Sequence, residues 1–197
     1  TKQEFASRLQ NACAAVTAAE QELTEIDSRF GDADHGLTMS KIAKAVSAAA
    51  GESEGGIQAM LDDAAMAVMV LNGGSAVPLW NTWLDGLQEE APEGNEIDTA
   101  GIQAIFAKAL KALSDMSGAK VGDKTMMDAL IPASQAIAAY SGSDEAGLFD
   151  AAAQAALQGA EASKQFVSKF ELGEQTIGTP DAGAASMAYF FQGLARP

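Results

Sequence analysis

Apolar residues recur every three or four positions along most of the chain, the spacing of amphipathic helices. Two apolar stripes flank a turn at residues 27–36, the first made of Phe5, Leu9, Val16, Leu23 and Ile26 and the second of Leu37, Ile42 and Val46. The first stripe predicts one helix that runs up to Asp27, and the second predicts another that begins after the turn. The turn itself therefore joins two helices.

Six more stretches have the same spacing. They predict helices over residues 57–71, 78–87, 102–116, 123–140, 145–169 and 184–194, with Pro78 in a first turn and Asp123 as an N-cap. Short loops between helices favour antiparallel neighbours. We expect an all-α fold in which residues 1–197 form a single domain, an antiparallel barrel or bundle of about eight helices. The loops after the first, third, fifth and seventh helices then fall at one end.

Composition agrees with helices and limits the partners. The chain is 48% hydrophobic but only 6% aromatic, and its formal charge is −15. This charge argues against nucleic acid and against an anionic membrane surface as partners. A lone cysteine, Cys13, excludes an internal disulfide, and the sequence has no apolar run long enough to span a bilayer. We expect a cytoplasmic protein.

The turn at residues 27–36 holds the candidate chemistry. It brings Asp27, Asp32 and Asp34 close to His35, the only histidine of the chain. Three neighbouring carboxylates repel one another unless a cation neutralises them, and hard oxygen ligands suit magnesium or calcium. His35 and the N–H groups at the start of the next helix suit a phosphate. The alternative is an Asx-rich turn in which Asp34 only caps that helix.

Four segments together resemble the nucleotide-binding L subunit of dihydroxyacetone kinases. They are Asp27 with Gly31-Asp32-Ala33-Asp34-His35-Gly36, then residues 72–79, 121–126 and 172–184. The resemblance spans nearly the whole chain. It implies a closed eight-helix barrel with the four loops around one nucleotide.

The resemblance also implies roles for individual residues. Asp27, Asp32 and Asp34 would hold two Mg²⁺ ions against the phosphates of ADP or ATP, and His35 would position the phosphoryl group. The implied nucleotide contacts are His35, Gly36, Leu37, Thr38, Gly74, Ser75, Ala76, Gly118, Thr125, Met126, Gln175 and Asp181. Among these, Gly118 and Met126 would lie near the adenine. Lys124 is the one cation inside a motif, and both a surface position and a phosphate contact are considered for it.

Some positions depart from the family pattern. The second loop reads Ser75-Ala76-Val77 where the family usually has Ala-Ser-Gly, so the serine is displaced by one place. Gln175 replaces the usual arginine, and Thr179 replaces a histidine. Loss of a guanidinium near phosphates removes a strong charge-assisted contact.

The leading hypothesis is a magnesium-ADP/ATP-binding subunit of a dihydroxyacetone-kinase-like phosphotransferase. By resemblance, a separate K subunit holds the small ketose, and a phosphotransferase-system M subunit and a homodimer are further partners to consider. One alternative is a non-catalytic regulatory or scaffolding subunit that retains the fold. A weaker alternative is a metal-dependent phosphohydrolase that works alone.

Overall fold

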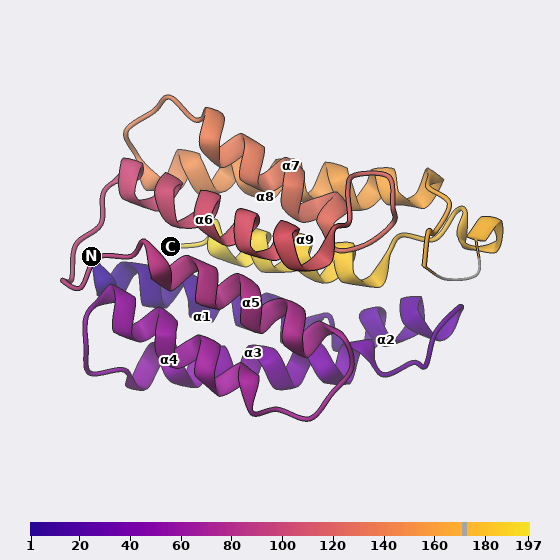
Figure 1. Cartoon of the computed structure of the whole chain (residues 1–197), viewed down its shortest axis with the longest axis horizontal. Coiled ribbons are helices and arrows are strands. Elements are labelled where there is room, and N and C mark those ends of the chain that lie inside the picture. Colours follow the sequence, from indigo (N-terminus) through magenta and orange to yellow (C-terminus); the bar gives the residue numbers. More distant parts are fainter. Residues whose placement is uncertain (171–172) are drawn as a thin grey trace.

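The computed structural model describes residues 1–170 and 173–197, and within them all regular secondary structure is helical, without strands (Figure 1). Glu171 and Leu172, which belong to the predicted fourth loop, lie outside the described residues. The α-helices are α1 (Lys2–Ala18), α2 (Glu20–Ser28), α3 (His35–Glu52), α4 (Ile57–Met69), α5 (Ala76–Glu89), α6 (Thr99–Ser117), α7 (Met127–Ala139), α8 (Glu145–Ala162) and α9 (Ala182–Leu194). Two short 3₁₀ helices, Ser163–Gln165 and Gly173–Thr176, lie between α8 and α9.

Eight of the helices form a closed ring. In the order α1, α3, α4, α5, α6, α7, α8 and α9 each helix packs on the next, and α9 returns to pack on α1. The short helix α2 packs on α3 and α9 beyond the end of α1. The predicted all-α barrel is therefore confirmed, with α2 as an addition to it.

The prediction of one continuous first helix is wrong. Ala19 separates α1 from α2, with φ −93° and ψ 6°. No proline or glycine marks this break in the sequence. Leu23 of α2 is fully buried, because the short helix turns to pack on its neighbours. Tertiary packing has thus overridden a local helical pattern.

The predicted seventh helix is also too long. Helix α8 ends at Ala162, and the chain continues as a 3₁₀ turn followed by an irregular segment. The Ser163 hydroxyl donates to the carbonyl of Ala160 and accepts from the backbone N–H of Asp181, across the loop. Residues 163–170 and 173–181 therefore belong to the loop that approaches α9.

Aromatic side chains fill the centre of the barrel. Trp83 is fully buried, and its ring lies edge-on to Trp80, Phe106, Phe190 and Phe191 at centroid distances of 5.5–6.2 Å. This is the preferred geometry of packed aromatic rings. Trp80 and Trp83 are both buried in this core.

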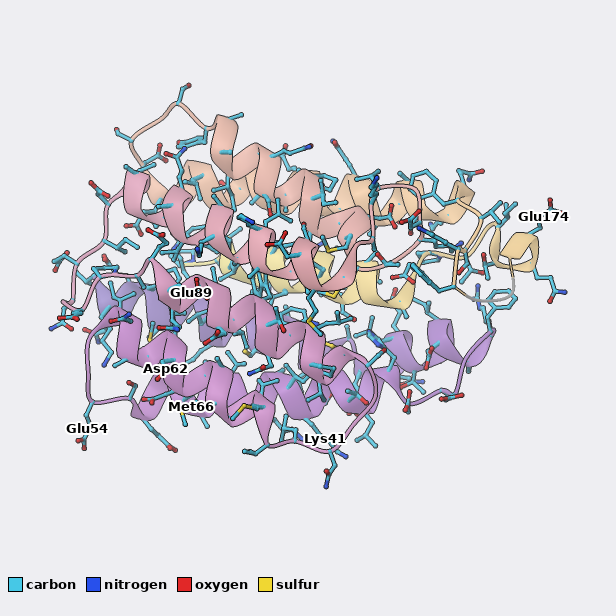
Figure 2. All side chains as sticks on the ribbon, in the orientation of Figure 1. Lys41, Glu54, Asp62, Met66, Glu89 and Glu174 are labelled. Carbon is cyan, nitrogen blue, oxygen red and sulfur yellow. The ribbon has the colours of Figure 1, made fainter. Side chains whose placement is uncertain are left out.

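Charged side chains cover the outside. Lys41 is exposed on α3, Glu54 is exposed in the loop between α3 and α4, and Glu174 projects from the loop before α9 (Figure 2). In the part of the chain that the structure describes, no helix is both long and apolar enough to cross a membrane.

The loops after α2, α4, α6 and α8 all lie at one end of the barrel, on the right in Figure 1. Both chain termini lie at the other end. The predicted clustering of the four motif loops is therefore correct. It follows from the antiparallel order of the ring.

The seam that closes the ring depends on Gly193. A Cβ at this position would lie 2.3 Å from Cα of Ala12 and 2.4 Å from the carbonyl oxygen of Asn11. Backbone atoms cannot move aside as a flexible side chain can. We expect Gly193→Ala to lower the free energy of unfolding by about 1–3 kcal/mol, measured by urea denaturation.

Gly51→Ala is the matched control. Gly51 is also helical, but it is exposed and would meet only the side-chain amide of Gln10. This substitution should change stability by less than about 1 kcal/mol, in the stabilising direction. Equal effects of the two substitutions would contradict close packing at the α1–α9 seam.

Candidate functional site

The four motif loops surround a cavity of about 550 Å³. Its lining includes residues from each loop, and Trp80 and Leu113 contribute apolar surface from the barrel. Helices α3, α5, α7 and α9 begin around it. Because the first N–H groups of a helix have no partner within the helix, this arrangement favours an anionic ligand.

The first loop folds around the carboxylate of Asp27. Its Oδ2 accepts from the backbone N–H groups of Asp34 and His35, at 3.1 and 3.2 Å. It thereby binds the start of α3 from the end of α2. The Asp34 side chain accepts no capping bond at this helix start. Asp34 therefore occupies the N-cap position of α3, as the alternative expected, but its side chain does not cap the helix.

Asp27, Asp32 and Asp34 all line the cavity. Asp32 and Asp34 are exposed, whereas Asp27 is partly buried. Within residues 1–170 and 173–197, no three histidine, cysteine or acidic side chains lie close enough together to hold a metal ion. The structure thus brings the predicted carboxylates to one cavity but leaves them apart.

His35 is held by the last helix. Its Nε2 lies 2.5 Å from Oγ of Ser186, and this hydroxyl donates to the carbonyl of Ala182. Burial lowers the pKa of His35, and the carboxylates of Asp27 and Asp34 oppose that shift only in part. A neutral imidazole whose Nε2–H donates to Ser186 fits this geometry.

The second loop approaches the first closely. A Cβ at Gly73 would lie 3.1 Å from the methyl group of Thr38, and one at Gly74 would lie 3.7 Å from Oδ2 of Asp34. Thr38 is buried, yet it lines the cavity together with Gly74, Ser75 and Ala76. The predicted residues of this loop therefore lie together at the cavity, as the resemblance implied.

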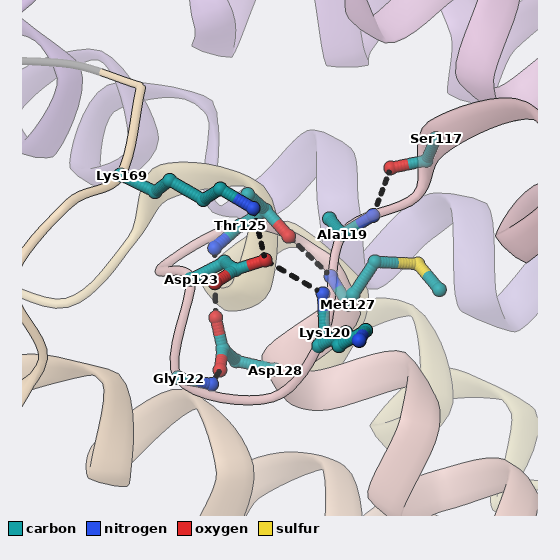
Figure 3. Close-up of polar contacts among 9 residues, drawn as sticks. All are labelled: Ser117, Ala119, Lys120, Gly122, Asp123, Thr125, Met127, Asp128 and Lys169. Atoms are coloured by element: carbon teal, nitrogen blue, oxygen red, sulfur yellow. Dashed lines mark hydrogen bonds and ion pairs between the residues drawn. The ribbon is translucent and has the colours of Figure 1, made fainter.

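Asp128 organises the third loop (Figure 3). Its buried carboxylate accepts from the backbone N–H groups of Gly122 and Thr125, at 2.6 and 2.7 Å. Asp123 instead accepts from the N–H of Lys120, and α7 begins only at Met127. The prediction of Asp123 as N-cap is therefore wrong.

Thr125 and Asp128 bind backbone N–H groups around the start of α7, whose N-cap position is Met126. Oγ1 of Thr125 accepts from the N–H of Met127, while Asp128 binds the N–H of Thr125. A Thr-x-x-Asp sequence is a close relative of the capping box. This spacing was visible in the sequence and could have located the helix start.

The fourth loop ends at Asp181, whose Oδ2 accepts from the N–H of Ala184 and so caps α9. Asp181 also lines the cavity. Thr179, which stands where the family usually has histidine, accepts a bond of 3.2 Å from the guanidinium of Arg29. This bond connects the first loop with the fourth.

Four residues predicted to bind the nucleotide are not among those lining the cavity: Gly36, Leu37, Gly118 and Gln175. Gly36 instead allows α3 to pack closely on α2, since a Cβ there would lie 2.3 Å from the carbonyl oxygen of Glu20. Gly118 ends α6 with φ 66°, and the Leu37 and Gln175 side chains are exposed.

Sequence reasoning missed several residues at the site. Ser186 holds His35, Asp128 holds the third loop, and Ser168 and Phe170 line the cavity. Ser168 falls in the segment predicted to be helical, and Phe170 directly follows it. Ser186 has no signal in the local pattern, because its partner lies 151 positions away.

Comparison with known proteins identifies relatives along most of the chain. The sequence pattern of the DAK2 domain matches residues 29–196. The D-erythrulose kinase of Mycolicibacterium smegmatis is 36% identical over 183 residues, which cover 88% of this chain and 32% of the relative. The L-erythrulose kinase of Pectobacterium atrosepticum is 34% identical over 197 residues, covering 93% and 32%. The chain thus spans 32% of the length of these relatives.

A relative of similar length is the ADP-binding subunit DhaL of the PEP-dependent dihydroxyacetone kinase of Escherichia coli. It is 27% identical over 193 residues, covering 93% of this chain and 91% of the relative. Among solved structures, the dihydroxyacetone kinase from C. freundii in complex with AMP-PNP and Mg²⁺ matches with a TM-score of 0.75 and 23% identity. That match covers 97% of this chain and 33% of the kinase, and it shows the shared fold.

The protonation of His35 provides a test of the site geometry. The only histidine gives one imidazole Cε1–H signal in NMR spectra, and we expect its titration midpoint below the ordinary value of about 6.5. The unfolded histidine binds a proton more readily than the buried one. At pH values above the ordinary pKa, where the ring is neutral in both states, burial of His35 therefore carries no protonation penalty and the fold is most stable. This stability is lost as the pH falls below that value.

Asp34→Asn should move the His35 midpoint still lower, because the Asp34 charge raises the pKa of the ring. A midpoint at or above the ordinary value in the unaltered protein would contradict burial of the imidazole against α9.

Proposed function

Because this chain belongs to the DAK2 domain family, we propose that it is the magnesium-nucleotide-binding unit of a kinase that phosphorylates a small ketose. The nucleotide is ADP or ATP, held with two Mg²⁺ ions, and residues 1–197 act as one domain. The observation that carries this proposal is the convergence of all four motif loops on one cavity.

The donor chemistry of the cavity supports a metal-bound phosphate. Asp27, Asp32 and Asp34 offer carboxylate oxygens, the ligands that magnesium prefers, and they face the same space. A bound cation would neutralise the mutual repulsion of these carboxylates and favour their approach to it. Bound magnesium supplies charge neutralisation at the phosphate oxygens.

The other residues of the site would position the nucleotide. His35 and Thr38 lie at the start of α3, with Ser75 and Ala76 at the start of α5, so backbone N–H groups surround the proposed phosphate position. Met126 and Met127 present an apolar surface suited to a base. Transfer of a phosphoryl group depends mainly on such positioning and charge stabilisation.

The acceptor is a short ketose held elsewhere. The two erythrulose kinases that match at 34–36% identity are about three times as long as the matched segment, so most of each relative lies outside it. The DhaL relative is named as one subunit of its kinase. Both facts support a second unit, of the K type, that holds the acceptor.

The surface around the site supports a protein partner there. Ten large apolar side chains are exposed among the described residues: Leu37, Met66, Met69, Val70, Met116, Val121, Leu157, Val167, Phe170 and Ile177. Each of these residues lies in one of the four motif loops or in the half of a helix that adjoins such a loop. A gathering of exposed apolar residues at one end is typical of an interaction surface.

Substitution of a proposed metal ligand tests the site. We expect Asp34→Asn to weaken magnesium-dependent binding of ADP and ATP by more than about a hundredfold in calorimetric titrations, because a charged ligand is lost. Asp63→Asn, on the exposed face of α4, is the matched control and should bind as the unaltered chain does. Circular dichroism should show the same helical content in both variants.

Unchanged nucleotide affinity in Asp34→Asn would contradict the metal site. If the unaltered chain binds no nucleotide, the scaffolding function is favoured instead, in agreement with the exposed Gln175 at the position of the family arginine. Mass spectrometry of the purified chain should precede the titration, since retained ADP would identify a lasting cofactor.

The need for a second unit gives a separate prediction. The chain alone, incubated with Mg²⁺, ATP and either dihydroxyacetone or erythrulose, should form no ketose phosphate detectable by mass spectrometry. Phosphate release should be followed in the same samples. Formation of ketose phosphate would contradict the need for a second unit. Magnesium-dependent release of phosphate without any ketose phosphate would favour the phosphohydrolase alternative.

A further inference from the structure

Lys124 is a buried cation in the third loop, not a surface lysine. Its side chain is only 6% exposed, and its Nζ donates to the carbonyl oxygens of Thr176 and Phe166, at 2.6 and 3.4 Å. Both acceptors belong to the fourth loop. A buried ammonium group is retained at a cost in solvation, so its hydrogen bonds have to compensate for it.

The backbone at Lys124 has an unusual conformation that aims the side chain. Its φ is +62°, in the left-handed region that residues with a Cβ rarely adopt. Asp128 binds the N–H groups of Gly122 and Thr125, which lie on either side of Lys124 (Figure 3). The carboxylate therefore holds the turn in this conformation.

The neighbouring residue makes a second connection between the same two loops. The carbonyl oxygen of Asp123 accepts from the N–H of Lys169 at 3.2 Å, and Oδ2 of Asp123 lies 3.6 Å from Nζ of Lys169 (Figure 3). Adjacent residues of the third loop thus bind the fourth loop at positions 166, 169 and 176.

The segment fixed in this way forms part of the candidate site. Ser168 and Phe170 line the main cavity, as does Lys124 itself. A smaller recess next to the cavity is lined by Lys124 together with Asp27 and Thr176. Lys124 therefore lies where the first, third and fourth loops meet.

We propose that Lys124 is a positioning residue that clamps the fourth loop onto the third and so sets the affinity of the cavity for its ligand. The part of this inference that concerns affinity rests on the proposed nucleotide-binding function. The clamp itself does not. A direct ion pair between Lys124 and a phosphate is the competing explanation.

Hydrogen exchange without nucleotide tests the clamp. Lys124→Met removes the ammonium group and keeps the strained backbone, whereas Lys124→Gly removes both, because glycine adopts positive φ freely. In both variants the amides of Lys169 and Gly178 should exchange about tenfold faster. This factor corresponds to the free energy lost when a hydrogen bond from a charged group is removed. Amides of α1 and α5 should be unchanged.

Lys120→Met is the matched control, since Lys120 lies in the same loop but is exposed. It should exchange as the unaltered protein does. Normal exchange in both Lys124 variants would overturn the clamp. Faster exchange in Lys124→Met alone would also overturn it, because backbone strain rather than the ammonium group would then be responsible.

Titration with Mg²⁺ and AMP, ADP or ATP tests the consequence for the site. A clamp predicts that both Lys124 variants lose affinity for each nucleotide by one common factor, about tenfold. A loss that grows with the number of phosphates would overturn the proposal in favour of a direct ion pair. Unaltered affinity together with faster loop exchange would overturn the positioning role.

The two proposals fail in different ways. If the unaltered chain binds no nucleotide, the proposed function is contradicted, and the exchange experiment still supports or overturns the clamp.

Discussion

The loops at the site end depend on carboxylates that accept hydrogen bonds from backbone N–H groups. Asp27 binds the start of α3, Asp128 holds the turn before α7, and Asp181 caps α9. Each first turn of a helix leaves N–H groups that need acceptors, and buried ones are costly if unmet. These three side chains therefore shape the cavity before any ligand is considered.

Two of these carboxylates, Asp27 and Asp181, also line the cavity, and this gives the site a particular electrostatic character. A chain of net charge −15 presents acidic groups to a space surrounded by helix N-termini. Such a site suits an anion that arrives with its own cations, because the metal meets the carboxylates and the phosphate meets the N–H groups. A magnesium-nucleotide has this combination of charges.

The barrel and the loops at the site end are packed differently. The ring of helices is closed by tight contacts such as that of Gly193 on α1, and its aromatic centre is fully buried. The site end instead has exposed apolar residues and irregular loops joined by individual contacts, among them those of Arg29 and Lys124. A firm support with irregular loops at one end agrees with the proposed role, in which this unit would meet both a ligand and a second protein.

The sequence determined the all-α class, most helices and the clustering of the four motif loops, because helical periodicity and short connections are local signals. It also pointed to Asp27, Asp32, Asp34 and His35. Only the tertiary structure decided where the first helix breaks, that Gly36 serves packing, and that Lys124 reaches Thr176. These features depend on contacts between elements, such as that of Lys124 with a carbonyl 52 positions away, and no local spacing encodes them.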